Sequence, residues 1–272
     1  MTKEFEKNTF IKRFGSMLKV DFKRLFLSRF FYIFVACCLL APILILVMTS
    51  MMDGTVSIDP NTGKETVTEG FDYVWQIIGT VNKDKGATEA AAMEMNMITM
   101  CNIDMLCFAI AAFVSIFVAV DFKCGYSKNL FTVRAKKSDY VASKTIVLFT
   151  ACTIMMLAFF IGAILGGIFG SVSFAMDGFG VMELILCLLT KIFLTLSLTS
   201  IFLTVAVTAK SKMWISIILS MLSCMLFFTM ISMIAPLNAT VIHLVVSLGV
   251  GVALAFGAGA ISCLMLNKTS LT

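Results

Sequence analysis

Charged side chains are scarce in this chain of 272 residues: Asp, Glu, Lys and Arg make up 14%, whereas hydrophobic residues make up 60%. A soluble globular domain has roughly a quarter charged residues and about half apolar ones. The shortage of charge therefore excludes an ordinary soluble protein and indicates an integral membrane protein.

Groups that could do chemistry inside a membrane are also rare. The apolar segments hold almost no ionisable side chain besides Asp104, and the chain has a single histidine, His243. A charge at the bilayer centre costs about 2.5 to 3.5 kcal/mol, so ionisable residues there usually mark function. We interpret Asp104 as an interfacial acid rather than a proton relay, and His243 as an interfacial residue rather than a ligand. The nine cysteines lack metal-site spacing and are interpreted as small apolar residues. We expect no catalytic, metal or cofactor site in the chain.

Long apolar runs dominate what is present. A helix of about 20 apolar residues crosses the hydrocarbon core of a bilayer. Six runs have this character; they cover 30–52, 103–120, 145–170, 192–208, 213–235 and 240–266. We expect the fourth helix to start before its run, near Glu183. We therefore predict an all-α polytopic membrane protein with six transmembrane helices, in which 1–29 is a cytoplasmic segment and 30–272 is the transmembrane domain.

Positive charge is distributed unevenly along the chain. Of 21 Lys and Arg residues, 17 precede the first run, lie in 121–144, or occur at 210, 212 and 268. Short cytoplasmic loops carry such an excess, so both termini and 121–144 are predicted to be cytoplasmic. The acidic segment 53–97 is predicted to be the external loop. Its aromatic residues Phe71, Tyr73 and Trp75 suit either the outer headgroup zone or a cap over the exit of a transport path.

The N-terminal segment is amphipathic. Apolar residues recur three or four positions apart, with basic residues on the other side, which is typical of a helix lying on a membrane surface. We predict an interfacial helix on the inner leaflet. Its principal residues are Phe10, Phe14, Leu18 and Phe22 on the apolar side, with Lys19, Lys23 and Arg24 on the basic side.

The basic segment 121–144 also has an apolar stripe. Phe122, Tyr126, Leu130 and Val133 follow one another at spacings of four, four and three, which predicts a short amphipathic helix. The charge alone is explained by topology and by contact with anionic lipid. The stripe adds a second interpretation, in which the helix docks onto a partner protein or onto lipid.

Taken together, these features resemble the permease subunit of a type-2 ABC exporter. An amphipathic helix leads into the first span, a basic helix follows the second span, and Ser-Lys opens the third. The residues that carry the resemblance are Asp121, Gly125, Lys128, Asn129, Leu130, Arg134 to Lys137, Ser143 and Lys144.

The resemblance implies a coupling helix within the cytoplasmic loop 121–144, which binds a groove of a separate ABC ATPase subunit. The implied docking residues are Tyr126, Lys128, Asn129, Leu130, Val133, Arg134 and Lys137. No G-x-x-x-x-G-K-[ST] phosphate loop occurs in the chain, which is therefore not expected to be an enzyme. ATP and Mg would be bound by two copies of the ATPase.

The implied activity is export by alternating access across a bacterial plasma membrane. Six spans are half of the usual twelve-helix pore, so a second permease is expected, in a homodimer or a heterodimer. An amphipathic peptide, a lipophilic toxin or drug, or a lipid is the expected cargo. The residues of the substrate path are not assigned, and no nucleic acid partner is expected. The alternative is a non-transporting membrane scaffold or sensor subunit.

Small residues recur four apart in two of the predicted spans. Such patterns let helix backbones approach closely. We favour contacts within one chain, with an interface between two permeases as the alternative. The two stripes are Gly162, Gly166 and Gly170 in the third span, and Gly249, Ala253 and Gly257 in the sixth.

Overall fold

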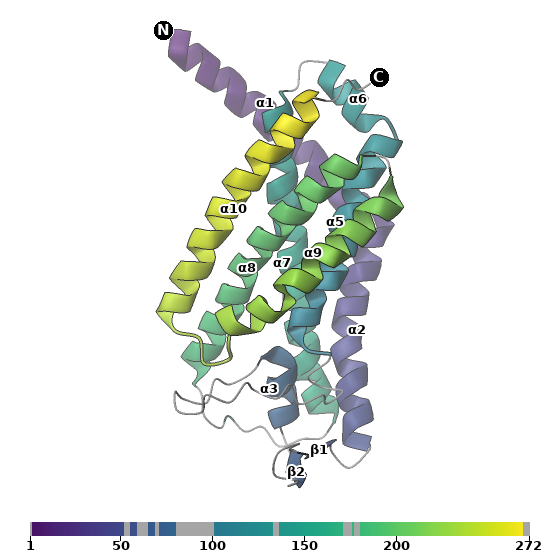
Figure 1. The fold of residues 1–272 in the computed structure, drawn as a ribbon, viewed down its shortest axis with the longest axis vertical. Helices are drawn as coiled ribbons and strands as arrows, with labels where there is room; N and C mark the ends of the chain where they lie inside the picture. Colours follow the sequence, from purple (N-terminus) through teal and green to yellow (C-terminus); the bar gives the residue numbers. More distant parts are fainter. Residues whose placement is uncertain are drawn as a thin grey trace.

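The computed structural model describes residues 2–51, 55–58, 65–68, 71–79, 101–132, 136–170, 176, 180–210 and 212–268. Long helices form a bundle (Figure 1), which confirms the predominantly helical prediction. The helices of the bundle are α2 (Arg29–Met51), α5 (Leu106–Lys123), α7 (Lys137–Phe169), α8 (Val181–Ala209), α9 (Met213–Ile234) and α10 (Val241–Lys268).

The described chain also contains α1 (Thr2–Leu27), the short helices α3 (Asp72–Ile78) and α6 (Tyr126–Thr132), and the 3-10 turn η1 (Ile103–Met105). The sequence did not predict the antiparallel hairpin of β1 (Thr55–Ile58) and β2 (Glu65–Thr68).

Within the described residues, five helices are long and apolar enough to cross a membrane: Arg29–Met51, Ile103–Lys123, Lys137–Phe169, Val181–Ala209 and Val241–Asn267. The remaining predicted span, 213–235, coincides with α9. Its apolar stretch, Met213–Phe227, is shorter than those of the five candidate spans. The structure therefore supports five of the six predicted spans, and the sixth stays a prediction. Helix α7 starts earlier than predicted, at Lys137, whereas α8 starts at Val181, close to the expected early start near Glu183. The Glu183 carboxylate accepts a hydrogen bond from the Gly180 backbone N–H.

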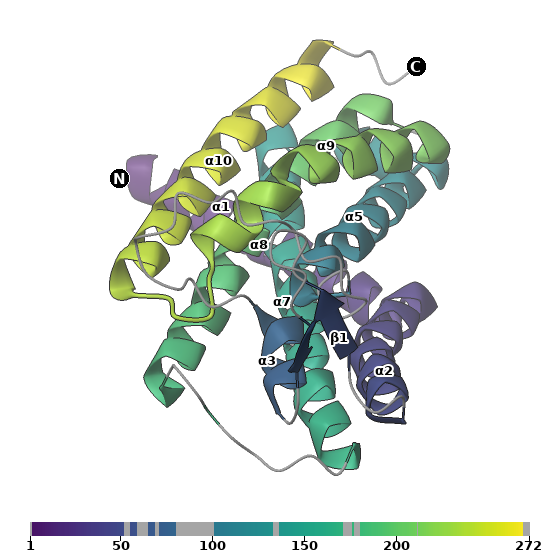
Figure 2. The same ribbon diagram turned by 60° about the horizontal axis from the view of Figure 1, so that its bottom comes forward.

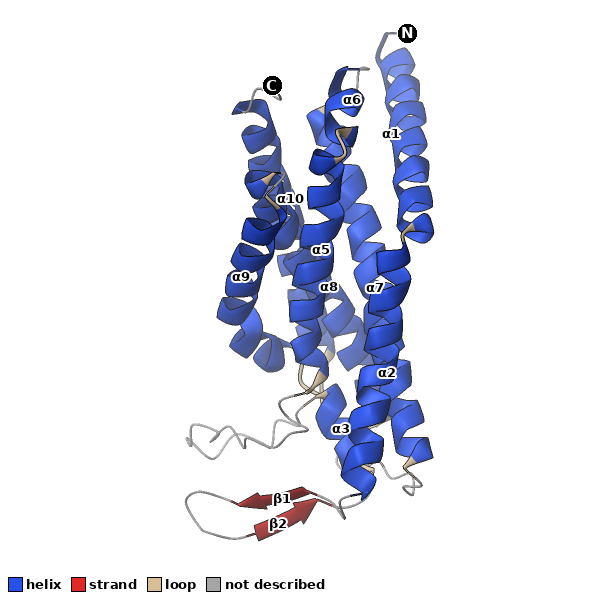
Figure 3. Ribbon diagram, turned by 90° about the vertical axis from the view of Figure 1, so that its right-hand side faces the viewer, coloured by secondary structure: helices blue, strands red, loops and turns tan. Residues whose placement is uncertain are grey.

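The two ends of the bundle carry different elements. The N-terminal end of α1, the C-terminal end of α10 and helix α6 lie at one end, whereas α3 and the hairpin lie at the other (Figures 1 and 3). This arrangement agrees with termini and loop 121–144 on one side, and their cytoplasmic orientation stays a prediction. Helix α1 leaves the bundle obliquely from the top of α2 (Figure 1), and its predicted place on the inner leaflet is also untested.

Helices α2 and α7 pack with their backbones in close approach. A Cβ atom on Gly162 would overlap the Leu39 carbonyl oxygen and would lie 2.9 Å from Cγ of Pro42. A Cβ on Gly166 would lie 2.8 Å from Cδ1 of Leu46. Only glycine at these positions lets α2 come this near, as small-residue stripes permit in membranes. Gly170, next in the stripe, faces Ser50.

The predicted stripe of α10 does not form such a contact within the chain. Added Cβ atoms on Gly249 and Gly257 would meet nothing within 4 Å, and Ala253 is exposed. The close approach to α8 is made instead at Gly251, where a Cβ would lie 3.0 Å from the Phe193 carbonyl oxygen. The favoured contact within one chain is therefore not seen for this stripe, and an interface between two permeases stays a prediction.

Helix α3 is part of the packed core. Figure 2 shows α3 beside the end of α7, and the side chains of Phe71 and Trp75 are at most 4% exposed. A Cβ on Gly167 of α7 would lie 2.6 Å from Val74 and 2.9 Å from Phe71. These aromatic residues therefore pack on protein rather than extending into a headgroup layer.

Two contacts correct the interpretation of the spans. Cys107 on α5 and Cys224 on α9 form a disulfide, so these two cysteines are not simply small apolar residues. Asp104 is 4% exposed and accepts a hydrogen bond of 2.6 Å from Lys191 on α8. The acid is therefore buried in an ion pair with Lys191, in place of the interfacial position predicted for it. The partners are far apart in sequence, which is why neither pairing was predicted.

Candidate functional site

Helix α6 follows α5 directly through a sharp turn at Gly125. The φ angle of Gly125 is 70°, in the left-handed region that glycine adopts without strain. The Gly125 carbonyl then accepts a hydrogen bond from the Asn129 N–H, which begins the new helix. Ser127 adds a hydrogen bond of 3.4 Å from its hydroxyl to the backbone carbonyl of Asp121. The turn sets α6 across the end of the bundle, where the coupling helix was predicted.

The apolar side of α6 faces the chain's own core. Leu130 and Phe131 are partly buried and pack against core residues, as does Phe122 at the end of α5. The Phe131 ring meets Tyr140 edge-on, with centroids 5.5 Å apart. Asn129 is exposed. Leu130 is therefore partly used in packing within the chain, and the polar side of α6 is the more exposed surface.

The other predicted docking residues have different positions. The Lys137 ammonium donates a hydrogen bond of 2.7 Å to the backbone carbonyl of Leu266, near the C-terminal end of α10. Val133 and Arg134 lie outside the described residues, as does the side chain of Lys128. Tyr126 is half-buried, with its ring turned toward α1.

Beneath α6 lies a buried cluster of charges that the sequence did not reveal. The Lys144 ammonium is fully buried and lies 2.8 Å from a carboxylate oxygen of Asp21 and 2.7 Å from one of Asp121. Both acids are also fully buried. Arg24 donates a hydrogen bond of 2.6 Å to the other oxygen of Asp121. We call Asp21, Arg24, Asp121 and Lys144 the charge cluster; its formal charges cancel.

Hydroxyl groups donate further hydrogen bonds to the carboxylates of Asp21 and Asp121. The Ser143 hydroxyl donates to Asp21 at 2.7 Å, and the Tyr140 hydroxyl donates to Asp121 at 3.2 Å. The Tyr126 hydroxyl is 3.5 Å from Asp21. Buried charges are tolerated only when paired and hydrogen-bonded in this way. The charge cluster therefore ties α1 to α5 and α7, about 100 residues further along the chain, and Tyr126 connects it to α6.

Arg24 also stacks on α6. Its guanidinium carbon lies 3.9 Å from the centroid of the Tyr126 ring, a cation–π contact. Burial acts to lower the pKa of Arg24, but the attraction and hydrogen bond of Asp121 outweigh it and raise that pKa. Burial, with a smaller contribution from Asp21, raises the pKa of Tyr126. Arg24 therefore stays a cation and Tyr126 a neutral phenol across the physiological range.

The predicted interfacial helix contributes both acids and bases to this region. Arg13 of α1 donates a hydrogen bond of 2.9 Å to Asp139 of α7, a second ion pair between these helices. A signal for Asp21 was present in the sequence, because Met17, Asp21 and Leu25 are four residues apart on one side of a helix. All three are buried. An acid on the apolar side of a basic helix requires a buried partner.

The other predicted residues of α1 occupy mixed environments. Leu18 and Phe22 are partly buried and pack against the core, whereas Lys19 and Lys23 are exposed. Phe14 is half-buried, and the side chain of Phe10 lies outside the described residues. The apolar side of α1 therefore packs on the bundle with Leu18 and Phe22, and Lys19 and Lys23 on its basic side are exposed.

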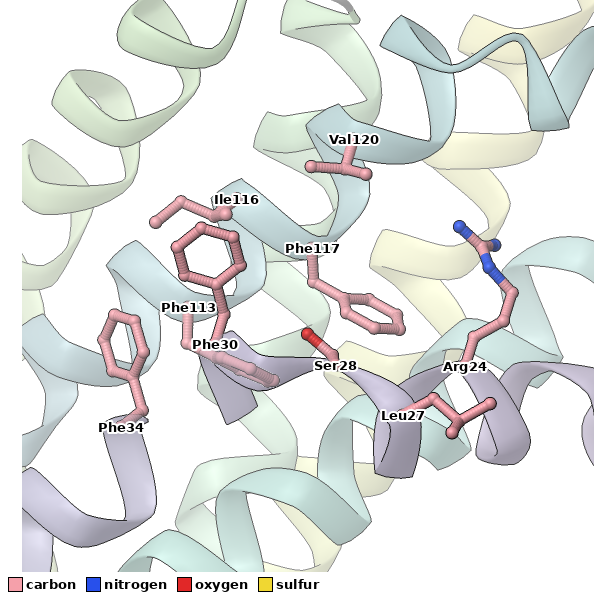
Figure 4. Close-up of a pocket in the computed structure, with 9 residues that line it drawn as sticks. All are labelled: Arg24, Leu27, Ser28, Phe30, Phe34, Phe113, Ile116, Phe117 and Val120. Carbon is pink, nitrogen blue, oxygen red and sulfur yellow. The ribbon is translucent and has the colours of Figure 1, made fainter. Parts of the chain in front are cut away.

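A groove of about 290 Å³ borders Arg24 between the α1–α2 junction and α5 (Figure 4). Its walls are mostly aromatic and aliphatic, with Arg24 and Ser28 as the polar members. Figure 4 labels the lining side chains: Arg24, Leu27, Ser28, Phe30, Phe34, Phe113, Ile116, Phe117 and Val120. In the described part of the chain, no three His, Cys, Asp or Glu residues are grouped so as to hold a metal ion.

The apolar helices and the buried charge cluster define a multi-pass helical membrane protein. Comparison with family models matches residues 17–226 to the ABC-2 family transporter proteins, so the chain belongs to that family and the predicted resemblance is confirmed. Searches of curated proteins and of solved structures returned no match.

Proposed function

We propose that the chain is the permease subunit of an ATP-driven exporter whose ATP-binding site, with its Mg, belongs to a separate ABC ATPase subunit. The observation that carries the proposal is α6, a short helix set across one end of the bundle and connected to the charge cluster. Membership of the ABC-2 family supports the same assignment. Two ATPase copies and two permeases would form the complete exporter.

The docking surface that we propose is the polar side of the loop, including Lys123, Asn129 and Lys136, all of which are exposed. This replaces Leu130 as a docking residue, because its packing against the core makes it part of the permease fold. Exposed positive charge at the edge of an interface mainly governs encounter and register with an acidic partner surface. The ATPase is therefore expected to offer carboxylates to this loop.

An amphipathic cargo, such as a peptide, a lipophilic toxin or a lipid, suits the groove beside Arg24. Binding pockets combine an apolar lining with a few polar groups that orient the ligand. Here the rings of Phe30, Phe34 and Phe113 supply the apolar lining, and Arg24 with Ser28 supplies the polar end. An apolar portion of the cargo would lie among the rings, with its polar portion toward α1.

Co-purification from native membranes tests the proposal. Wild-type permease should retain an ATPase subunit, and the charge reversals Lys123→Glu with Lys136→Glu should reduce the retained amount about tenfold at low salt, with a smaller effect at high salt. Lys212→Glu is the matched control, because Lys212 is an exposed lysine between α8 and α9 at the same end of the bundle. If wild-type permease brings down no ATPase, the chain is a scaffold or sensor subunit instead.

A further inference from the structure

Contacts of aromatic side chains hold α6 against the bundle. The backbone connects it to α5 at Gly125, whose left-handed conformation makes a hinge-like corner. Beyond that corner, Tyr126 lies under the Arg24 guanidinium of α1 at 3.9 Å, and Phe131 meets Tyr140 of α7. The orientation of α6 about its hinge therefore depends on which of these contacts is intact.

Arg24 is also anchored to α5 by a charged hydrogen bond. Its second amino group donates to Asp121 at 2.6 Å, and Asp121 is in turn bound by Lys144 at 2.7 Å. A guanidinium can make such an in-plane hydrogen bond and an out-of-plane ring contact at the same time, because it is planar. Arg24 thus joins α6 to α1 with little freedom to turn away.

Helix α1 continues into the first span, α2, almost without interruption. A single non-helical residue, Ser28, separates α1 from α2, and hydrogen bonds from Ser28 to Leu25 and from Phe31 to Ser28 continue the turn across the junction. Close packing at Gly162 and Gly166 then fastens α2 to α7. A displacement of α1 would carry α2 and α7 with it, because side chains at backbone contact cannot absorb it.

We propose that Arg24 and Tyr126 are positioning residues that transmit movement of α6 to α1, and through Ser28 to α2 and α7. The proposal rests on the proposed function, in which the ATPase moves α6. It adds a specific route, and it assigns Tyr126 to the inner side of the coupling helix rather than to the docking surface. A cation–π contact at a desolvated site shifts an equilibrium about tenfold.

Hydrogen–deuterium exchange of backbone amides in the permease–ATPase complex tests this route without an attached probe. The complex is compared with and without a non-hydrolysable ATP analogue, and exchange is followed in peptides from α6 and α1. In wild type, the analogue should change exchange in both helices. In Tyr126→Leu, which removes the aromatic ring, the change should remain in α6 and fall about tenfold in α1. Tyr126→Phe keeps the ring and should restore the response.

Phe131→Leu is the matched control, since it removes the other aromatic contact of α6 but leaves Arg24 and Tyr126 in place. The response of α1 should survive in that variant. The inference is overturned if α1 responds fully in Tyr126→Leu, which would make the contact stabilising only, or if Phe131→Leu abolishes the response equally. A wild-type complex in which the nucleotide changes neither helix would instead contradict the proposed function, because α6 would then receive no signal.

Discussion

Replacing Lys144 with methionine removes the cation that two buried carboxylates share. Asp121 would keep its hydrogen bonds from Arg24 and Tyr140. Asp21 would lose its closest cation and keep only the hydroxyls of Ser143 and Tyr126, with an Arg24 nitrogen 3.9 Å away. Breaking a buried pair by removing one partner costs about 3 to 5 kcal/mol. We expect Lys144→Met to lower the free energy of unfolding by that amount, with Asp21 as the origin of most of the loss.

A second substitution identifies the source of the cost. Asp21→Asn in the Lys144→Met background removes the unpaired charge and leaves the Arg24–Asp121 pair neutral, so it should recover about 2 kcal/mol. Lys23→Met is the control for losing a lysine near this region, because Lys23 is exposed on α1. It should change the free energy of unfolding by less than about 0.5 kcal/mol.

The free energies are measured by unfolding the purified permease in mixed micelles with increasing mole fractions of sodium dodecyl sulfate, followed by circular dichroism. A Lys144→Met variant as stable as the wild type would refute the assignment of a buried, mutually dependent cluster. So would a double variant no more stable than Lys144→Met alone, since Asp21 would then not be the group left unpaired.

Two further predictions concern the helix packing and the topology. Gly162→Ala should lower the yield of monodisperse protein in detergent and cost about 1 to 3 kcal/mol, because its Cβ would overlap the Leu39 carbonyl; Gly249→Ala, with nothing within 4 Å, should elute like wild type. Equal elution profiles for both variants would contradict the close α2–α7 contact. With the native cysteines removed, a cysteine replacing Lys64 should react with an impermeant maleimide in intact cells, and one replacing Lys136 should not. The opposite labelling pattern would reverse the predicted orientation of the termini.

Much of the helical fold could be predicted from the sequence because hydrocarbon selects for long apolar helices. The positions of α2, α5 and α10 agree closely with apolar runs. The start of α7 could not be placed this way, because its first turns, from Lys137 to Lys144, are polar and were interpreted as loop. Hydropathy measures which residues tolerate lipid, and it cannot show that a polar turn continues a helix when its partners are protein groups.

The candidate site was located only in part. The loop 121–144 was identified from charge and periodicity, but Leu130 and Tyr126 were assigned to an outer docking surface, whereas they face the bundle. An amphipathic pattern states that one side of a helix is buried without saying against what. Asp21, Asp121 and Lys144 were missed as a group because they are about 20 to 120 residues apart in sequence.

The sequence by itself determined that this chain is a helical membrane protein, because composition and apolar run length are local properties. A few residues after the second span carried the resemblance to the ABC-2 family, which the family comparison confirmed. The tertiary structure decided which charges are neutralised: Lys144 meets Asp21 across 123 positions, and Lys191 meets Asp104 across 87. It also decided which glycines touch a neighbouring backbone. The physical reason is that desolvation and close packing depend on what surrounds a residue in space, and separations of this size leave no periodic trace along the chain.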